Sequence, residues 1–340
     1  MCGINGLITA DSDLKRKIKE ANDLIKHRGP DDEGYVFINT GSSEVRQFSG
    51  NDSPEEIKYK YPLLTFDNKN GEEVILAHRR LSIIDLSANG HCPMCDSDGN
   101  IWLTYNGEIY NYIELREELK SAGYKFRTTS DTEVIINSYL HWGTECLNKF
   151  NGMWAFAIWD TRKKRLILAR DRFGVKPLYY TKEQNYFAFS SELKPLAAYK
   201  NFEIDINRKK IPFYLIYGNR LNSNDTYLNG INTLPASHYL VFENGRTELV
   251  QYYDIADTGK TNLNETELTG SIVALLEDSI KLRFRSDVPV GTCLSGGFDS
   301  SSIVSLASDA GENNIETFSA VWNEKDCDES YYIDIVNERF

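Results

Sequence analysis

The second residue of the chain is a cysteine, within the opening stretch MCGINGLI. If the initiator methionine is removed, as is common before a small residue, Cys2 carries a thiol and a free α-amine. The thiolate is the reactive form of cysteine, and an α-amine with a pKa of about 7.7 to 8.0 can accept the thiol proton near neutral pH. The stretch therefore predicts a nucleophile with its own base; the alternative is a small residue placed there by chance.

The segment SGGFDSS, residues 295–301, is the second stretch that could do chemistry. It is predicted to join a buried strand to a helix, so its backbone N–H groups lie at a helix N-terminus, where an anion is favoured. Gly296 and Gly297 let a phosphate approach the backbone closely. The segment lacks the Gly-Lys-Ser/Thr of the common P-loop, and the alternative is a turn whose glycines serve geometry alone.

Composition indicates which partners and which location to expect. The chain has 340 residues, of which 41% are hydrophobic and 26% charged, and its formal net charge is −12. This charge argues against nucleic acid and anionic membranes, because both attract clustered Lys and Arg. There is no basic-then-apolar leader and no run of about 18 apolar residues, so we expect a cytoplasmic protein that acts on small molecules and contacts no membrane.

The cysteines do not suggest a metal or a disulfide scaffold. Six cysteines in a chain of this length are too few for such a scaffold. Cys92 and Cys95, in HCPMC, have the spacing of a zinc or redox motif, but no second pair completes a site. We therefore expect no metal ion held by cysteines.

The elements that must position these residues fall into three regions, with two domains expected from the length. Residues 1–200 are rich in the alternating and continuous apolar runs typical of strands. Helices are predicted over 111–123 and 130–143, the second with Ser130 as its cap and Glu133 completing a capping box.

The remaining regions have different patterns. Residues 201–262 contain many Asn, Asp and Gly residues and are predicted to be a connecting region. From 263 to 340 strand and helix patterns alternate, which predicts the beginning of a parallel α/β sheet. Its first helix, 264–284, places apolar residues at helical spacing, and a buried strand is predicted over 288–295.

Eight segments, in order along the chain, resemble those of the glutamine-hydrolysing asparagine synthetase family. They are MCGINGLI, HRGPDDEG, LAHRRLSIIDLS, YNGEIYNY, SDTEVI, FNGMWAFAIWD, RDRFGVKPLYY and FAFSSELKPL. SGGFDSS is similar to the pyrophosphate-binding loop of the ATP pyrophosphatase group. The resemblance implies an α+β Ntn-hydrolase αββα sandwich, the class II glutamine amidotransferase domain, over 1–200. It implies the incomplete start of an α/β adenine-nucleotide α-hydrolase-like, ATP-binding domain over 263–340.

The resemblance assigns roles around Cys2. Cys2 becomes the nucleophile of a glutaminase site, and Asn106 and Gly107 stabilise the tetrahedral oxyanion that forms on the glutamine amide. The alternative for this Asn-Gly pair is a tight hairpin turn.

Recognition of the amino-acid end of glutamine is implied for three charged residues. Arg80 binds the α-carboxylate, which suits a bidentate guanidinium, and Glu108 and Asp131 hold the α-ammonium. Ordinary ion pairs are the alternative for each, and the neighbouring Arg79 is expected to be surface or structural. The backbone of four further residues is expected to line the same pocket: Leu81, Ser82, Ile83 and Ile84.

The resemblance also implies an ATP site with Mg²⁺ neutralising the phosphate charge. The residues expected around the phosphates are Ser295, Gly296, Gly297, Asp299, Ser300 and Ser301. Asp299 is expected to bind Mg²⁺ or order the loop, because a carboxylate and a phosphate repel each other. Cys293 and Ala320 are expected to contact the adenosine.

Two departures from the family pattern affect the expected activity. Cys92 stands where the family usually has Gln, and the family's SGEGSDE segment, which closes the ATP site, does not occur within the 340 residues. We therefore expect this chain to release glutamate from glutamine and to form no asparagine.

The leading hypothesis is a glutamine-hydrolysing asparagine synthetase, in which ammonia amidates aspartate that ATP has activated as aspartyl-AMP. One alternative is a family amidotransferase that acts on another carboxylate, such as a sugar acid. A second is a non-catalytic remnant that binds glutamine or nucleotide. The resemblance further implies a homodimer formed through the N-terminal domain.

Overall fold

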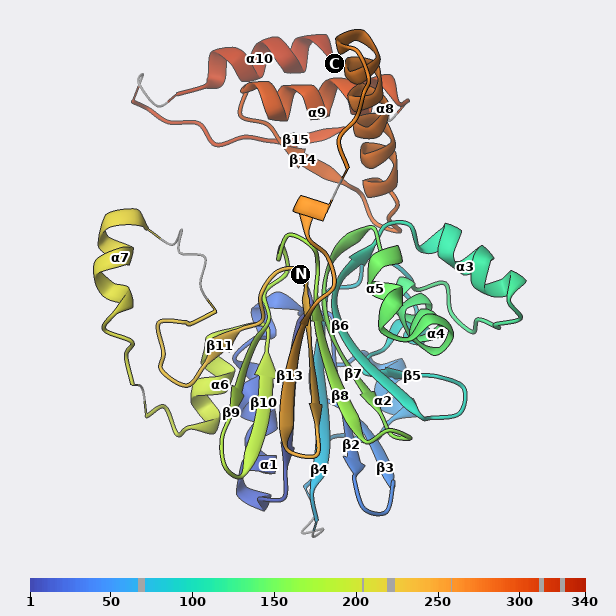
Figure 1. The fold of residues 1–340 in the computed structure, drawn as a ribbon, viewed down its shortest axis with the longest axis vertical. Coiled ribbons are helices and arrows are strands. Elements are labelled where there is room, and N and C mark those ends of the chain that lie inside the picture. Colours follow the sequence, from blue (N-terminus) through green and yellow to red (C-terminus); the bar gives the residue numbers. More distant parts are fainter. Residues whose placement is uncertain (67–70, 204, 219–223, 258, 312–314, 325–327) are drawn as a thin grey trace. The chain divides into compact units, whose positions relative to one another are not determined.

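Two antiparallel sheets form the centre of the unit made by the first 257 residues (Figure 1). The computed structural model describes residues 1–66, 71–203, 205–218, 224–257, 259–311, 315–324 and 328–340. One sheet has the order β11 (Asn232–Thr233), β9 (Tyr179–Lys182), β10 (Tyr186–Ser190), β1 (Gly3–Thr9), β4 (Glu73–Arg80), β2 (Asp32–Asn39) and β3 (Val45–Ser49). The other has the order β13 (Arg246–Gln251), β12 (His238–Glu243), β8 (Arg165–Arg170), β7 (Gly152–Asp160), β6 (Ile101–Ile109) and β5 (Met94–Cys95).

Helices cover the outer face of each sheet. The larger sheet packs against α1 (Ser12–Asp23) and α6 (Leu193–Tyr199). The smaller sheet packs against α3 (Tyr112–Ser121), α4 (Asp131–Trp142) and α5 (Cys146–Lys149). The other helices of this part are α2 (Glu55–Lys60), α7 (Lys210–Tyr217) and the 3₁₀ turns η1 (Lys26–Arg28), η2 (Ala88–Gly90), η3 (Gly143–Glu145) and η4 (Ile255–Asp257). The layers are therefore helix, sheet, sheet, helix, which is the αββα sandwich expected from the resemblance.

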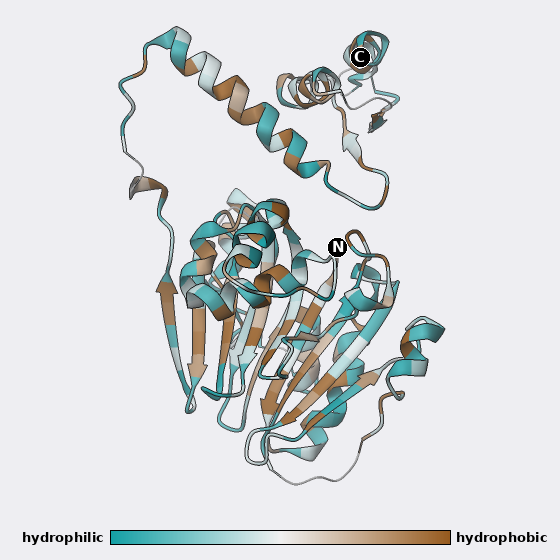
Figure 2. Cartoon of the chain, turned by 90° about the vertical axis from the view of Figure 1, so that its right-hand side faces the viewer, coloured by the Kyte–Doolittle hydropathy of each residue, from teal (hydrophilic) through white to brown (hydrophobic). Residues whose placement is uncertain are grey.

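The alternation of side chains along each strand explains the layering. In β2, Val36 and Ile38 belong to the core between the sheets, whereas Tyr35 and Phe37 pack under the outer helices. Because both faces of the strand are covered here, residues 35–38 form a continuous apolar run. Brown, the hydrophobic colour, is accordingly frequent along the strands of the sandwich (Figure 2).

β1 lies within the larger sheet, where it pairs with β10 on one side and with β4 on the other. All seven of its residues are buried. The strand begins directly after Cys2, so the sequence that anchors the N-terminus also fixes the position of that thiol.

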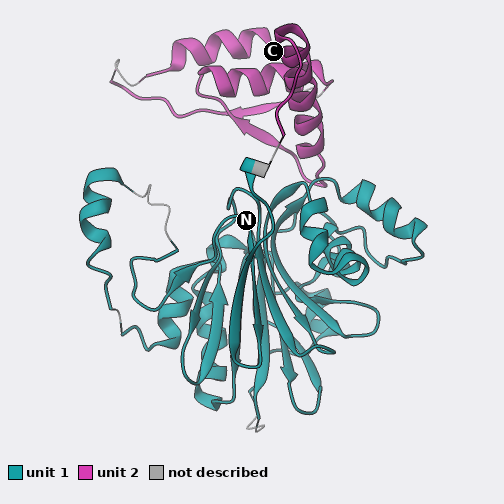
Figure 3. Cartoon of the chain, in the orientation of Figure 1, with its two compact units in different colours: residues 1–257 teal, residues 258–340 magenta. Residues whose placement is uncertain are grey.

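Residues 258–340 form a second compact unit (Figure 3). It contains α8 (Glu265–Arg283), β14 (Gly291–Cys293), α9 (Phe298–Asp309), β15 (Glu316–Phe318) and α10 (Ser330–Arg339). β14 and β15 pair in parallel, which confirms the predicted start of a parallel sheet. Its small core consists of Leu294, Val304, Ile333 and Val336.

Two details of this second unit differ from the sequence interpretation. β14 is exposed or half-buried rather than buried. The apolar residues Ile272, Leu275 and Leu276 of α8 are 48%, 69% and 45% exposed. The physical reason is that a sheet of two short strands offers little surface for the helix to cover.

The first unit extends further along the chain than the predicted glutaminase region. It ends at Asp257, and β11, β12 and β13 belong to its sheets. The structure therefore groups most of the predicted connecting region, 201–262, with the sandwich. Within the described residues, no helix combines the length and apolar character needed to cross a membrane.

The predicted helices over 111–123 and 130–143 are confirmed as α3 and α4. Ser130 caps α4 by accepting the Thr132 N–H at 3.1 Å. The capping box was wrong, because the Glu133 carboxylate instead accepts backbone N–H groups of Arg127 and Thr128 in the preceding loop.

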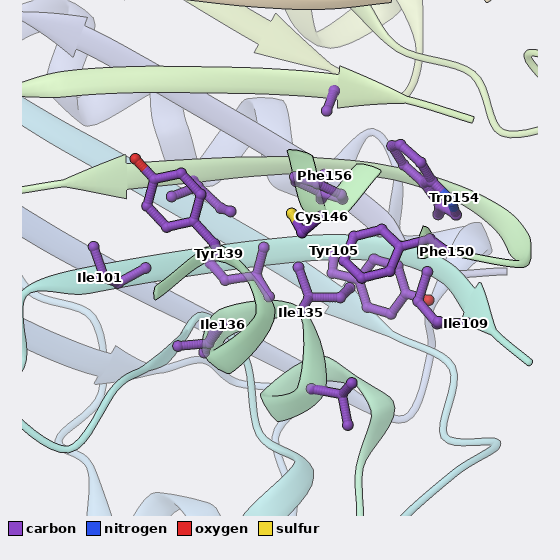
Figure 4. Close-up of a cluster of buried hydrophobic side chains, with 14 of the residues drawn as sticks. Ile101, Tyr105, Ile109, Ile135, Ile136, Tyr139, Cys146, Phe150, Trp154 and Phe156 are labelled. Atoms are coloured by element: carbon purple, nitrogen blue, oxygen red, sulfur yellow. The ribbon is translucent and has the colours of Figure 1, made fainter. Parts of the chain in front are cut away.

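A cluster of buried side chains joins α4 and α5 to the smaller sheet (Figure 4). The Trp154 and Phe156 rings stack with centroids 5.0 Å apart, and Phe150 meets Trp154 edge-on at 5.8 Å. Tyr105, in the same cluster, points its hydroxyl at Asp131, the first residue of α4. The cluster thus fixes the start of α4 relative to β6.

Candidate active site

A cavity of about 130 Å³ opens where β4 ends, near the end of β6 and at the start of α4. Nine of the ten residues predicted for the glutamine site line it: Cys2, Arg80, Leu81, Ile83, Ile84, Asn106, Gly107, Glu108 and Asp131. The tenth, Ser82, is outside the lining, and its N–H donates to the Asp31 carboxylate at 2.8 Å. Residues from distant parts of the sequence thus meet in one small space.

The Cys2 thiol lies against the backbone that follows β4. The Leu81 N–H donates a hydrogen bond to Cys2 Sγ at 3.4 Å. The Cys2 thiol in turn donates to the Leu81 carbonyl oxygen, which lies 3.6 Å from Sγ. Burial raises the pKa of the Cys2 thiol and lowers the pKa of the Met1 α-amine. Both shifts favour the neutral forms, so a thiolate at this position has to be formed by a nearby base during reaction.

Asn106 and Gly107 lie within β6, so the hairpin-turn alternative for this pair was wrong. Asn106 is fully buried, and among the described residues neither its Nδ2 nor its Oδ1 has a hydrogen-bond partner. A buried amide without partners is costly for folding and is normally explained by a ligand or a catalytic role.

Gly107 is required by the close approach of β7. A Cβ at this position would lie 2.2 Å from the Met153 carbonyl oxygen and 2.6 Å from the Trp154 Cα. Any side chain would therefore push β6 and β7 apart at the cavity, and would displace Asn106 with them.

Backbone carbonyls hold the Arg80 guanidinium. Nη1 donates to the Ser87 carbonyl at 3.2 Å, and Nη2 donates to the carbonyls of Ile84, at 3.3 Å, and of Asp85. The side chain is buried, and within the described part of the chain it forms no ion pair with a carboxylate. A buried, fixed and unneutralised guanidinium at a cavity wall is suited to binding an anion.

Two carboxyl groups line the cavity with Arg80. Asp131 Oδ2 accepts the Tyr105 hydroxyl at 2.8 Å and the Ile109 N–H at 3.0 Å. Burial raises the pKa of Asp131, and burial together with the Asp131 charge raises the pKa of Glu108 to about 6. The cavity therefore presents a cation and a pair of carboxyl groups, which is the pattern needed to hold the two charged groups of an α-amino acid.

The cavity also contains residues for which the sequence predicted no role. Lys176 lines it, and its loop is shaped by the Asp171 carboxylate, which accepts the N–H groups of Val175 and Lys176 at 3.0 Å. Burial lowers the pKa of Lys176, and the charge of Glu108 opposes that shift. The segment RDRFGVKPLYY was the only available signal, and it does not say which of its side chains turns inward.

His78 and Cys92 belong to the same lining. Burial lowers the pKa of His78 to about 3 and raises the pKa of Cys92 to about 12, so both are neutral at physiological pH. His78 Nδ1 lies 3.1 Å from the Thr104 hydroxyl. These neutral residues lower the polarity around the charged ones.

Arg79, by contrast, points away into the fold. It is fully buried and pairs with Glu33 at 2.5 Å, with Asp52 at 2.8 Å and with Asp23. Its carboxylate partners account for its charge, as expected for a structural residue.

The loop of the second unit closes on itself through hydroxyl groups. Ser295 Oγ and Ser300 Oγ are 3.1 Å apart, and the Gly297 N–H donates to Ser295 Oγ at 3.3 Å. Gly296 has a φ of 75°, in the left-handed region that favours glycine. Ser301 Oγ is buried and has no partner among the described residues.

The other three residues predicted for the nucleotide lie around this loop. Asp299 is exposed in the first turn of α9. Cys293 ends β14, and Ala320 follows shortly after β15, so both lie at the carboxyl ends of the paired strands and both are exposed. Within the described ranges, no group of His, Cys, Asp and Glu side chains could hold a metal ion, and Cys92 and Cys95 are free thiols.

Known proteins with this fold define its class. A glutamine phosphoribosylpyrophosphate amidotransferase from B. subtilis, solved with ADP and GMP, superposes with a TM-score of 0.53 at 17% identity. The match covers 95% of this chain and 67% of that chain. The sandwich of the first unit is thus the Ntn-hydrolase fold of the class II glutamine amidotransferases.

The sequence relationships are more specific. The family described as glutamine amidotransferase domain matches residues 66–253, and the one described as asparagine synthase matches 271–340. Because the first match spans more than half of the chain, the protein belongs to the glutamine amidotransferase family.

Curated relatives match almost the whole chain. A putative glutamine-hydrolysing asparagine synthetase 2 of Methanocaldococcus jannaschii is 38% identical over 100% of this chain and 63% of its own length. Asparagine synthetase 1 of Bacillus subtilis is 34% identical over 99% of this chain and 48% of its own length. Amidase chry2 of Gibberella zeae is 33% identical over 91% and 43%. The chain therefore spans less than two thirds of the length of each of these relatives.

Proposed function

We propose that the first unit hydrolyses glutamine to glutamate and ammonia, with Cys2 as the nucleophile after removal of Met1. The observation that carries the proposal is a single cavity containing the Cys2 thiol, the Asn106 amide and the oppositely charged Arg80 and Asp131. The buried Asn106 amide, which has no partner among the described residues, supports a role as an oxyanion donor.

The first half of the reaction forms a thioester. The α-amine of Cys2 accepts the thiol proton, and Sγ attacks the side-chain carbonyl carbon of glutamine. The carbonyl oxygen becomes an oxyanion, which accepts hydrogen bonds from Asn106 Nδ2 and the Gly107 N–H. Collapse of this intermediate breaks the C–N bond, and the leaving nitrogen takes the proton from the α-ammonium to depart as ammonia. Water then hydrolyses the thioester, with the α-amine accepting its proton, and releases glutamate and the thiol.

Charged groups give the selectivity for free glutamine. Arg80 is proposed to bind the α-carboxylate with two parallel hydrogen bonds, and Asp131 and Glu108 the α-ammonium. An amide without an α-amino acid end would leave the buried Arg80 and Asp131 without a charged partner, which costs binding free energy.

The proposal is tested by measuring glutamate release from glutamine, with the N-terminus checked by intact mass. Turnover is expected only for chains that have lost Met1, and Cys2→Ala should abolish it while leaving the unfolding transition unchanged. Turnover by the Cys2→Ala variant, or no turnover by a correctly processed and folded wild type, would contradict the assignment of Cys2.

We further propose that the ammonia is used for an ATP-dependent amidation of aspartate. This second reaction would take place in a longer protein that contains a complete domain of the kind that the second unit begins. The names of the relatives and the asparagine synthase match support this proposal. The left-handed Gly296 and the buried Ser301 hydroxyl without a described partner fit a phosphate-binding loop. MgATP would supply the activation of the acceptor carboxylate.

A second acceptor class is retained because of one observation. The similar amidase chry2 is not named an asparagine synthetase, so the acceptor carboxylate is not defined by similarity over these residues. Calorimetric titration with MgATP tests the nucleotide site of this chain. Product analysis of a full-length relative, offered aspartate and other carboxylates in parallel, identifies the acceptor.

Location and assembly are part of the same proposal. The five cysteines among the described residues are free thiols, which supports a reducing, cytoplasmic location.

We also propose a homodimer formed through the first unit. Light scattering on residues 1–257 and on the whole chain would test it, and a monomer in both would contradict it.

A further inference from the structure

We propose that Asp85 is a positioning residue that fixes Arg80 and Asp131, on the two sides of the amino-acid binding site, at a constant distance from each other. The inference rests on the proposed glutaminase function, because Arg80 and Asp131 are taken as the groups that bind the two charges of glutamine. Arg80 lies at the end of β4 and Asp131 at the start of α4, and each element has its own packing.

Asp85 contacts both halves. Its carbonyl oxygen accepts a hydrogen bond from Arg80 Nη2. Its carboxylate Oδ2 accepts the Thr129 N–H at 3.0 Å, two residues before Asp131. One residue therefore connects the guanidinium to the loop that leads into α4.

The other carboxylate oxygen strengthens the hold on Arg80. Asp85 Oδ1 accepts both the Ser87 N–H, at 3.2 Å, and the Ser87 hydroxyl, at 2.5 Å. The Ser87 carbonyl in turn accepts from Arg80 Nη1 at 3.2 Å. Two of the three carbonyls that orient the guanidinium thus belong to Asp85 itself and to the residue that its carboxylate fixes.

The backbone of Asp85 is unusual in a way that agrees with this role. Its φ is 57°, in the left-handed region, which asparagine and aspartate tolerate better than most residues. This turn brings the carbonyls of residues 84, 85 and 87 to one side, where Arg80 lies. Asp85 is only 7% exposed, so its carboxylate is turned toward these partners in the protein and not toward solvent.

The loop before Asp131 has other supports, but they come from elsewhere. Arg116 donates to the carbonyls of Thr128 and Ser130, at 2.6 and 2.8 Å, and the Glu133 carboxylate accepts N–H groups of the same loop. These contacts hold the loop against its own helices. Among these contacts, only the Asp85 carboxylate relates the loop to the Arg80 side of the cavity.

The perturbation is Asp85→Asn, which keeps the shape and the tolerance of positive φ. An amide has one acceptor oxygen, so it can accept from Ser87 or from Thr129, and its NH₂ group then faces an N–H. We expect the distance between Arg80 and Asp131 to become less well defined, which weakens recognition of both charges of glutamine at once.

The readout is selectivity between L-glutamine and glutaramate, which is glutamine without its α-amino group, measured as ammonia release. For Asp85→Asn we expect kcat/KM for L-glutamine to fall about tenfold or more, mostly through KM, and kcat/KM for glutaramate to fall much less. The selectivity ratio therefore decreases. An equal loss for both substrates, or an unchanged KM for L-glutamine, would overturn the proposal.

Asp96→Asn is the matched control. Asp96 is also 7% exposed and its Oδ1 accepts two backbone N–H groups, of Asn100 at 2.7 Å and of Ile101 at 2.9 Å, but it does not line the cavity. This variant should lose stability and keep the selectivity ratio. A ratio that falls equally in both variants would mean that buried aspartates act only through general stability, which refutes a positioning role.

A binding measurement separates this inference from the proposed function. L-glutamine is titrated calorimetrically into Cys2→Ala and into Cys2→Ala with Asp85→Asn, neither of which needs to turn over. About tenfold weaker binding by the double variant supports the positioning role even if the wild type proves inactive. Equal binding refutes it even if the wild type is an active glutaminase.

If Asp85→Asn fails to fold, Ser87→Ala takes its place, because it removes one donor to Asp85 Oδ1 and leaves the Thr129 bond intact. We expect a smaller decrease in the same selectivity ratio, about threefold. An unchanged ratio in Ser87→Ala would overturn the proposal.

Discussion

Replacing Asn106 by leucine should have opposite effects on stability and on activity. The side chain is fully buried, and its Nδ2 and Oδ1 have no partner among the described residues. Leaving a buried polar group unsatisfied costs about 1 to 3 kcal/mol, and leucine has the same branched shape without the polar atoms. We therefore expect Asn106→Leu to raise the free energy of unfolding of the first unit by about 1 to 3 kcal/mol.

The same substitution removes one of the two proposed oxyanion donors. Loss of such a donor costs about 10²- to 10³-fold in kcat in enzymes where it has been measured. We expect kcat for glutamine hydrolysis to fall by about this factor, with a small change in KM, because the interaction forms only in the transition state.

Two assays on one preparation check both signs. Urea unfolding followed by tryptophan fluorescence reports mainly on the first unit, since Trp102, Trp142, Trp154 and Trp159 lie there and only Trp322 lies in the second. Glutamate release gives kcat and KM. Lower stability in the variant would show that Asn106 is held by structural bonds, and a kcat close to the wild-type value would refute its role at the oxyanion.

Three further substitutions have distinct signatures. Burial raises the pKa of Glu108 from 4.5 to about 6, so the charged form of Glu108 destabilises the folded state. This destabilisation is absent below pH 4.5, where the group is protonated in both the folded and the unfolded state, and it is complete above about pH 6. Glu108→Gln should therefore be more stable than wild type by a margin that grows from pH 4.5 and is complete above about pH 6, as measured by urea titrations at several pH values. The wild-type KM for glutamine should rise as pH falls below about 6, and a KM that does not change with pH would contradict this. Arg80→Lys should raise KM for glutamine about 10- to 100-fold with little change in kcat. The reason is that an ammonium group cannot donate to the backbone carbonyls that hold Arg80 and also bind a carboxylate with two parallel hydrogen bonds. Initial-rate kinetics measure this, and an unchanged KM would argue against carboxylate binding by Arg80. Gly107→Ala should destabilise the first unit by about 1 to 3 kcal/mol in the same urea assay, since its Cβ would lie 2.2 Å from the Met153 carbonyl oxygen, and wild-type stability would refute that close approach.

The dipeptide Asn-Gly shows what local sequence can and cannot predict. At Asn106 it allowed a hairpin turn, yet the pair lies inside β6, where the pairing with β7 continues through both residues. At Asn244 and Gly245, with φ values of 50° and 71°, the same pair makes the turn between β12 and β13. The alternating residues around it were a hairpin signal within the predicted connecting region, and reading it would have extended the first unit.

The ordered motifs predicted which residues meet at the cavity, because they carried residue identity and not only periodicity. They could not predict Lys176 or Tyr105 as part of the lining, since the direction of a side chain depends on how its loop or strand is packed. Lys176 turns inward because Asp171 fixes the backbone before it, and Tyr105 because β6 presents it to α4. The exposure of the apolar face of α8 could not be predicted either. Helical spacing shows which residues share a face, but it does not show what covers that face.

The placement of β1 has a consequence for the motion of the chain end. Termini usually fray, with opening free energies near zero, and a nucleophile at residue 2 would then spend much of its time away from its substrate. Here the N-terminal strand can leave only by breaking its ladders with β10 and β4, and the Ile4 N–H is also held by the Ser191 hydroxyl at 3.0 Å. Amide hydrogens of this strand should therefore exchange with solvent only when the whole sheet opens, so the thiol keeps its place for as long as the first unit stays folded.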